Sequence, residues 1–476
     1  MFLDRELRRV VEFIRLAENE WHFKFIGQKI GMRYVGILLV LCSFPIFLWV
    51  LRSGASAQRW AIMALGALPV IGIALNIDAA FVSWAGWPGH TKGIIISLTD
   101  TLALAICVRL RNRAGYPQLM WMWIVYIACN IPGIFLGNFI APALFYIVSL
   151  IKAAVYFFAC YIVIYRGGLF TLVTGLCIAV FANSGTTILN FLQGQALPSG
   201  LVGHRNYAGM INNLAVPILL VVGTFGRLRT FPLLAVGVAG VAAILGSSRA
   251  VLILFGVTIY LTLILLLLVK PSKQTKQMLG VCVILSFLAI PIGIQKISQR
   301  SEDGQIVLTK DAERLAFERA ARMMNKDYPL GIGLNQYAVL ANAGGYSTAA
   351  GVGWATASLS ATVHNSYALV RTEGGPIALM GLLVLLTTTV ATSIAFMLRR
   401  RNNPARVFAI PAFVSVLVLS IHISIEWVFV SMNTLYAFAS VMAVIAYTKE
   451  ASRKDALQKK HASTPSEVSL SDNYIA

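Results

Sequence analysis

Residues 249–268 read RAVLILFGVTIYLTLILLLL, one arginine followed by a run without any further charge. A helix rises about 1.5 Å per residue, so about 20 such residues cover the roughly 30 Å hydrocarbon core of a bilayer. This stretch therefore predicts a membrane-spanning helix.

Comparable apolar runs recur along the chain, separated by short polar stretches. Several are short or interrupted by Pro and Gly, so their boundaries are approximate. We predict an all-α fold, a polytopic transmembrane bundle of about 12–13 helices. The runs lie near residues 34–51, 60–80, 93–109, 119–136, 143–164, 169–190, 208–223, 231–246, 249–268, 277–295, 374–397, 407–424 and 427–447.

The bulk composition agrees with a protein embedded in lipid. Of the 476 residues 58% are hydrophobic and 12% are charged, and the mean hydropathy is +0.75. A water-soluble core needs more polar residues to cover it. Lys and Arg number 39 against 19 Asp and Glu, a net charge of +20. In a soluble protein this excess would indicate nucleic-acid binding. Here the basic residues lie in short loops between apolar runs, so we expect contact with membrane lipids and no nucleic-acid partner.

The basic loops indicate an orientation, because such loops stay in the cytoplasm. If they are cytoplasmic, the long hydrophilic segment 296–363 lies outside, in the periplasm of a Gram-negative cell. The stretches 203–207 and 246–249 then lie at the same outer face. The basic loops contain Arg109, Arg111 and Arg113; Arg227 and Arg229; Lys270, Lys273 and Lys276; and Arg399, Arg400 and Arg401.

These boundaries divide the chain into five parts. Residues 1–33 form a polar or amphipathic N-terminal segment, and residues 34–295 a transmembrane region. Residues 296–363 form a large periplasmic loop containing short helices. Residues 364–448 form the C-terminal transmembrane helices, and residues 449–476 a basic, disordered cytoplasmic tail. Apolar periodicity within the loop predicts a helix over residues 311–325. Thirteen full spans would leave the basic N-terminus outside, against the charge rule. Either one of the first two runs does not cross, or the N-terminal segment lies at the interface; the sequence leaves both open.

Two polar clusters interrupt the apolar pattern where a charge needs partners or water. In residues 203–206, Arg205 would bind an anionic group or reach lipid headgroups, with His204 and Asn206 beside it. In residues 246–249, Ser248 and Arg249 stand in a tight turn between two apolar runs. There the guanidinium is expected to face a cavity, because it needs hydrogen-bond partners.

A third cluster combines His364 and Asn365, at the end of the long loop, with Glu373 at the start of the next apolar run. A lone histidine is more often a structural hydrogen-bonding residue than a base. Together with Arg205 and Arg249 on the same face, the histidine indicates a site for phosphate and a base. Guanidinium groups match phosphate oxygens, and a neutral imidazole can take a proton from a hydroxyl. Transfer from a diphosphate-linked donor needs both functions.

A metal ion could also neutralise a diphosphate, but we predict no metal and no cofactor. The acidic residues of the loop are spread out and include no paired Asp-x-Asp. The cysteines lie in apolar runs without ligand spacing. The acidic residues are Glu302, Asp303, Asp311, Glu313, Glu318 and Asp327. The cysteines are Cys42, Cys107, Cys129, Cys160, Cys177 and Cys282.

Motifs between about residues 200 and 400 carry a family resemblance. His364-Asn365, followed by Leu369, Glu373 and Gly375, resembles the signature of O-antigen ligases and Wzy-type polymerases. The stretch Arg314–Arg322 followed by Asp327–Leu334 resembles their loop, in which a short helix leads to a Pro-Leu-x-Gly-x-Gly turn. Residues 203–206 and Ser248-Arg249 resemble their upstream motifs. Ala378 departs from the ligase form of the signature.

The resemblance implies a metal-independent, inverting glycosyltransferase of the bacterial inner membrane, active on the periplasmic face. The donor would be an undecaprenyl-diphosphate-linked glycan, and the acceptor lipid A core for a ligase or another repeat unit for a polymerase. His364 would activate the acceptor hydroxyl, and Arg249 and Arg205 would hold the diphosphate. Asn365 and Glu373 would orient the base or contact sugar.

Two other classes of protein also fit many helices with few buried charges. A transporter usually carries its charges near the membrane midplane, whereas the candidates here lie at one face. A non-catalytic component of a polysaccharide-export complex would bind the donor without transferring it, among other polysaccharide-assembly proteins.

Overall fold

A computed structural model describes most of the chain. The described residues are 29–75, 78–111, 117–195, 197–226, 229–246, 248–302, 305–353, 358, 361–399, 404–445 and 447–448. Residues 1–28 of the expected N-terminal segment and the tail 449–476 lie outside them.

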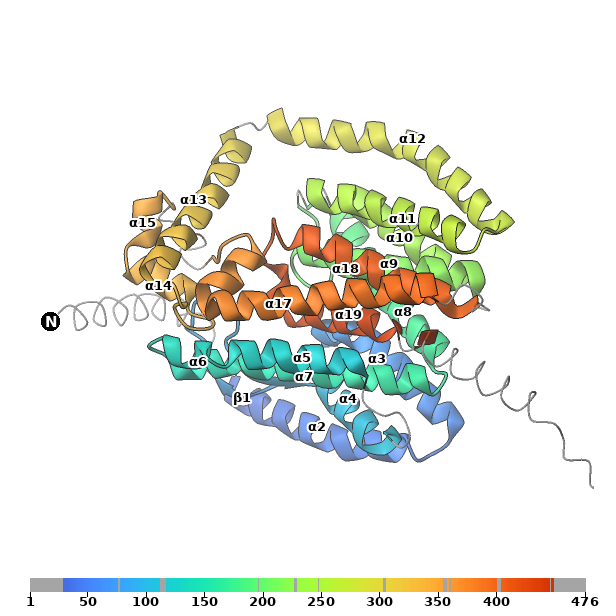
Figure 1. The fold of residues 1–476 in the computed structure, drawn as a ribbon, viewed down its shortest axis with the longest axis horizontal. Helices are drawn as coiled ribbons and strands as arrows, with labels where there is room; N and C mark the ends of the chain where they lie inside the picture. Colours follow the sequence, from blue (N-terminus) through green and yellow to red (C-terminus); the bar gives the residue numbers. More distant parts are fainter. Residues whose placement is uncertain are drawn as a thin grey trace, which may run out of the picture.

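The described chain is mostly helical, and apart from α12 and α13, which extend away from the rest, its long helices lie side by side in one bundle (Figure 1). The first half contains α2 (Lys29–Val50), α3 (Ala55–Leu75), α4 (Leu98–Leu110), α5 (Gln118–Asn130), α6 (Gly133–Leu136), α7 (Ile140–Tyr165), α8 (Leu169–Leu192) and α9 (Arg205–Phe225). The second half contains α10 (Thr230–Leu245), α11 (Arg249–Val269), α12 (Lys273–Glu302), α13 (Gln305–Asp327), α14 (Tyr337–Ala343), α15 (Tyr346–Ala350), α17 (Ser366–Arg399), η1 (Pro404–Ala409), α18 (Ile410–His422), η2 (Val428–Val430) and α19 (Met432–Ala443).

Seven helical stretches among the described residues are long and apolar enough to cross a membrane. They are Gln118–Leu136, Ile140–Tyr165, Leu169–Leu192, Arg205–Phe225, Arg249–Val269, Ser366–Leu398 and Ala405–His422. The polytopic helical architecture is therefore as predicted, while the count of about 12–13 spans stays a prediction. Helix α9 is the most enclosed of the seven, because 94% of its most apolar 18-residue stretch is buried.

Helix ends that flank the basic loops lie close together, as far as the structure describes them. Arg166, after α7, donates a 3.4 Å hydrogen bond to the carbonyl of Leu110, and Arg406 donates to the carbonyl of Val269. The Lys270 amine lies 4.8 Å from the ring centroid of Phe225. Helices α13, α14 and α15 and the start of α17 lie on the left of Figure 1, and hydrogen bonds through Glu426 join the starts of α9 and α11 to that of α17. The alternation of the runs across a membrane stays a prediction.

The all-α prediction missed a β-hairpin. Strands β1 (Asp78–Ser83) and β2 (Gly93–Ser97) pair antiparallel, with a register shift between Ala80 and Val82. The run expected over residues 93–109 is therefore a strand followed by the 13-residue helix α4. Three consecutive isoleucines in β2 favour the extended backbone. At the strand end, the Asp100 carboxylate accepts the Ser97 backbone N–H at 2.8 Å and so starts α4.

The loop expected over residues 296–363 begins later, because α12 continues to Glu302. Its helix predicted over residues 311–325 is confirmed as part of the longer α13. Two short helices, α14 and α15, follow. The turn between α13 and α14 uses Gly331 and Gly333 at φ +113° and +100°, a backbone region that residues with a Cβ rarely adopt. This turn packs its backbone against α17, with Gly333 N–H bonded to the Glu373 carbonyl at 3.0 Å.

Candidate functional site

Glu426, in the turn after α18, collects three side chains from distant parts of the chain. Its Oε1 accepts hydrogen bonds from Asn206 Nδ2 at 2.6 Å and from Arg314 Nη2 at 2.7 Å. Its Oε2 lies 3.2 Å from His364 Nδ1. Ser248 Oγ completes the group by donating to Asn206 Oδ1 at 2.9 Å. We call Asn206, Ser248, Arg314, His364 and Glu426 the Glu426 cluster.

The Glu426 cluster joins the starts of three long helices to the end of a fourth. Asn206 and Ser248 lie at the starts of α9 and α11. The turn holding Glu426 is bonded to the start of α17, since Ser366 Oγ donates to the Glu426 carbonyl at 2.8 Å and Ser366 N–H to the Ile423 carbonyl at 2.7 Å. The predicted convergence of the three polar stretches is therefore observed for Asn206, Ser248 and His364.

The Glu426 side chain is almost fully enclosed, with 2% of its surface exposed. Burial alone would raise the pKa of this carboxyl. The hydrogen bond from His364 and the charges of His364, Arg314 and His422 outweigh burial, so the pKa of Glu426 falls below its ordinary value. The carboxyl is therefore held as a carboxylate that only accepts hydrogen bonds.

His364 presents one ring nitrogen to Glu426 and keeps part of its ring open. Its side chain is 24% exposed, and the ring centroid lies 5.9 Å from that of Phe317 on α13. With the proton on Nδ1, the ring donates to Glu426 Oε2 and leaves the Nε2 lone pair free to accept a proton. A buried carboxylate that orients an imidazole is the usual support of a histidine base.

The remaining candidates of these stretches lie next to residues of the Glu426 cluster in the chain. Arg205 and Arg249 are the first residues of α9 and α11, half-buried and exposed respectively. His204 is exposed, and its ring lies 5.0 Å from that of Tyr207. Asn365 Oδ1 accepts the Ala368 backbone N–H at 3.1 Å, which makes Asn365 the cap of α17.

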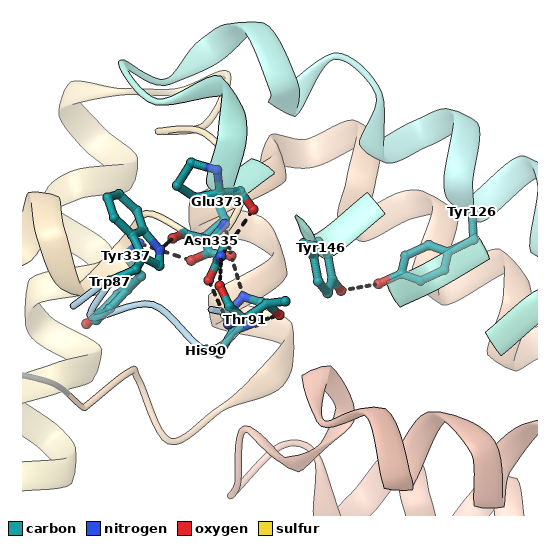
Figure 2. Close-up of polar contacts among 9 residues, drawn as sticks. Trp87, His90, Thr91, Tyr126, Tyr146, Asn335, Tyr337 and Glu373 are labelled. Atoms are coloured by element: carbon teal, nitrogen blue, oxygen red, sulfur yellow. Dashed lines mark hydrogen bonds and ion pairs between the residues drawn. The ribbon is translucent and has the colours of Figure 1, made fainter. Parts of the chain in front are cut away.

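Glu373 lies in a second group and not beside His364. Its Oε2 accepts the Asn335 backbone N–H at 2.8 Å and lies 3.1 Å from His90 Nε2, and its Oε1 accepts the Tyr337 backbone N–H at 3.0 Å. Figure 2 shows Glu373 next to Asn335, with His90 and Thr91 below them. We call His90, Asn335, Tyr337 and Glu373 the Glu373 cluster. Its contacts tie the turn after α13 to α17.

Asn335 is the centre of this second group. It adopts φ +59°, where asparagine is among the few side-chain-bearing residues tolerated. Its Nδ2 donates to the carbonyls of Thr91 at 2.6 Å and Pro142 at 3.1 Å, and its own carbonyl accepts from Trp87 Nε1 at 2.9 Å. The loop, the hairpin and α7 are thus locked together beneath the start of α17.

A bend in α17 permits this packing. Gly375 has φ +76° inside the helix, and a Cβ there would meet the Leu330 carbonyl oxygen. Gly375→Ala is therefore expected to lower the unfolding temperature of the detergent-purified chain, because φ +76° with ψ −172° is a conformation almost confined to glycine and costs other residues about 1–3 kcal/mol. Gly256→Ala on α11, where a Cβ meets no atom within 4 Å, is the control. Equal unfolding temperatures for the two variants would contradict the bend's role.

Sequence reasoning missed Glu426 as a site residue and met Arg314 only in the family resemblance. Glu426 fell between two apolar runs, and a lone acid inside such a stretch is itself a signal, because burying a carboxylate in a membrane protein requires partners. Arg314 lies in the helix predicted over residues 311–325, and its side chain is 42% exposed apart from its contact with Glu426.

Within the part of the chain that the structure describes, no three His, Cys, Asp or Glu side chains are grouped closely enough to hold a metal ion. Compared with known proteins, the chain matches no family model and, by sequence, no curated protein. The functional assignment therefore rests on the geometry of the two clusters.

Proposed function

We propose that this chain is a membrane glycosyltransferase of the O-antigen ligase or Wzy-type polymerase kind. It would move a glycan from undecaprenyl diphosphate to an acceptor sugar at the periplasmic face of a bacterial inner membrane. The observation that carries the proposal is the bond between His364 Nδ1 and the buried Glu426 carboxylate, at the point where α9, α11 and α17 begin.

The starts of α9 and α11 suit the anionic part of the donor. A helix N-terminus carries a partial positive charge and unpaired backbone N–H groups, and it favours phosphate. The bond between Ser248 and Asn206 holds these two starts together, and each carries an arginine in its first turn, Arg249 and Arg205. Two guanidinium groups and two helix ends would bind the diphosphate and stabilise it as it leaves.

The acceptor hydroxyl would give its proton to His364 Nε2 as its oxygen attacks the anomeric carbon. The new glycosidic C–O bond forms while the C–O bond to the diphosphate breaks, and undecaprenyl diphosphate leaves with the electron pair. Attack from the opposite face inverts the anomeric centre. The resulting imidazolium is stabilised by the Glu426 carboxylate. Proton and charge are balanced in this step without a metal ion.

The distribution of basic residues supports the proposed orientation of the chain in the membrane. The described helix ends that flank the basic loops, such as the end of α11, lie at the other ends of helices whose starts carry the Glu426 cluster, as the positive-inside rule requires of an enzyme active outside the cytoplasm. A transporter is less suited, because these candidate residues lie at helix ends.

Deleting the gene tests this proposal in the cell and distinguishes the two reactions. Loss of a polymerase leaves single repeat units on lipid A core, whereas loss of a ligase leaves lipid-linked glycan without core. The measurement is gel and mass analysis of extracted glycolipids, with the wild-type gene restored as the control. An unchanged glycolipid profile after deletion would contradict both.

Arg249→Ala is expected to lower the transfer rate by about 10–100-fold, since it removes donors from the departing diphosphate. Arg249→Lys should recover only part of this rate, because an ammonium lacks the two-pronged donor geometry. The matched control is Arg229→Ala, also exposed beside a helix start, α10, but in a basic loop of the opposite end. Initial rates at saturating acceptor measure the effect. Full activity of Arg249→Ala would exclude it from the diphosphate site.

A further inference from the structure

A cavity of about 460 Å³ lies beside the Glu426 cluster, between the hairpin, α3, α7 and α19. Its volume falls within the range of about 300–1,000 Å³ typical of small-molecule sites. Tyr207 and Trp427 form part of its wall, and these residues directly follow Asn206 and Glu426. Their rings meet edge to face at 5.4 Å. The cavity and the Glu426 cluster therefore share one wall.

Lys152, which forms an ion pair with Asp100, lines the cavity at membrane depth. Lys152 lies near the middle of α7, about 18 Å along the helix axis from Ile140 at 1.5 Å per residue. Its amine is 3.0 Å from Asp100 Oδ2 and donates to the Ile95 carbonyl at 2.5 Å. Asp100 also accepts from Tyr436. A lysine at this depth marks a polar or hydrated interior, because its charge is costly in lipid.

The hairpin backbone points to the same conclusion. Non-helical backbone is tolerated at membrane depth only where it is buried in protein or lines a water-filled space. Strand β2 reaches Lys152 through the Ile95 carbonyl, and Gly93, Ile95 and Ser97 line the cavity. Two independent features, a paired lysine and a strand, therefore indicate a wet cavity inside the bundle.

The lining chemistry fits a sugar. Lys152 is paired with the partly buried carboxylate of Asp100, and His90 with the buried carboxylate of Glu373. The cavity is also lined by the hydroxyl and amide groups of Thr91, Ser149, Ser431 and Asn433. The rings of Tyr207 and Trp427 form part of the same lining. Hydroxyls and amides exchange hydrogen bonds with sugar hydroxyls, and aromatic rings pack on the apolar faces of sugar rings.

We propose that this cavity is a carbohydrate-binding subsite that holds the acceptor sugar. The carbohydrate assignment stands on the cavity alone, whereas the acceptor role rests on the proposed function. Trp427 directly follows Glu426, so a sugar held against Trp427 would lie close to the residue that orients His364. The cavity would then select the acceptor, while the helix starts hold the donor.

Gly72 on α3 offers a clean way to fill the cavity. It lines the cavity, and a Cβ at this position meets no atom within 4 Å. Gly72→Leu should therefore occupy ligand space without disturbing packing. Gly256→Leu, at an equally open helical glycine on α11 away from the cavity, is the matched control. Asn433→Leu removes a lining amide and serves as the second variant.

The probes are the methyl glycosides of glucose, galactose, mannose and N-acetylglucosamine. Binding to the full chain in nanodiscs is measured by saturation-transfer NMR. Wild type and Gly256→Leu should saturate at least one probe, and Gly72→Leu and Asn433→Leu should lower that signal at least several-fold. In transfer assays, Gly72→Leu should raise the KM for acceptor and leave that for donor unchanged.

Two outcomes would overturn the proposal. One is the absence of signal from all four glycosides with wild type, including the case in which co-purified lipid fills the cavity. The other is undiminished binding by both variants. Sugar binding without transfer by wild type would keep the carbohydrate site and reject the acceptor role together with the proposed function, so the two failures are distinguishable.

Discussion

His364→Ala is expected to lower the rate of glycan transfer by about 10²–10⁴-fold, the usual contribution of a general base. The Nε2 lone pair is the proton acceptor of the proposed reaction, and alanine removes it while leaving the donor-binding helix starts intact. Single-turnover transfer from undecaprenyl-diphosphate glycan measures the loss. Binding of the donor should stay close to that of wild type.

His364→Gln separates a base from a positioning residue. A glutamine amide can hydrogen-bond to Glu426 or to an acceptor hydroxyl, but it cannot take the proton. Equal loss in the alanine and glutamine variants supports proton transfer by His364. Recovery of most of the activity by glutamine would mean that the ring only positions the acceptor.

Glu426→Gln is expected to lower transfer by about 10²–10⁴-fold, by analogy with the amide replacement of the carboxylate in a Ser-His-Asp triad. The amide loses the negative charge that stabilises imidazolium. It also turns one of its contacts with Asn206, Arg314 or His364 into an unfavourable pairing of two donors. Single-turnover rates measure the effect, and Glu318→Gln on α13 is the control. Wild-type rates in Glu426→Gln would remove the carboxylate from the mechanism.

The same substitution should change the stability of the chain with pH. The folded state lowers the pKa of Glu426, so its carboxylate stabilises the fold fully above the ordinary pKa of glutamate. This contribution is lost as pH falls through the lowered pKa. The unfolding temperature of wild type should therefore exceed that of Glu426→Gln near pH 7, and the difference should shrink below about pH 4. A difference that grows in acid would contradict the assigned charge.

The sequence predicted the bundle well because lipid imposes strong rules. Apolar length predicts helices such as α11, and the alternation of basic and polar loops predicts which helix ends meet. That is why His364, Asn206 and Ser248 could be expected on one face although they are far apart in the chain.

The sequence did not predict the β-hairpin or the contacts of Glu373 and Glu426, and each case has a physical reason. An apolar run such as 93–109 does not reveal whether it is a strand or a helix, because both bury apolar side chains. The role of Glu373 depends on backbone donors of Asn335 and Tyr337, and no side-chain pattern encodes these. Glu426 could have been found, since a lone acid between apolar runs needs partners.

Transfer by the purified full chain tests the central claim most directly. Wild type is given undecaprenyl-diphosphate glycan and EDTA, with lipid A core or a second lipid-linked repeat unit as acceptor, and products are resolved by mass. We expect transfer in EDTA to one acceptor, with release of undecaprenyl diphosphate and loss of activity in His364→Ala. Donor binding without transfer to either acceptor, or transfer undiminished in His364→Ala, would contradict the account and favour transport or an assembly role in the first case.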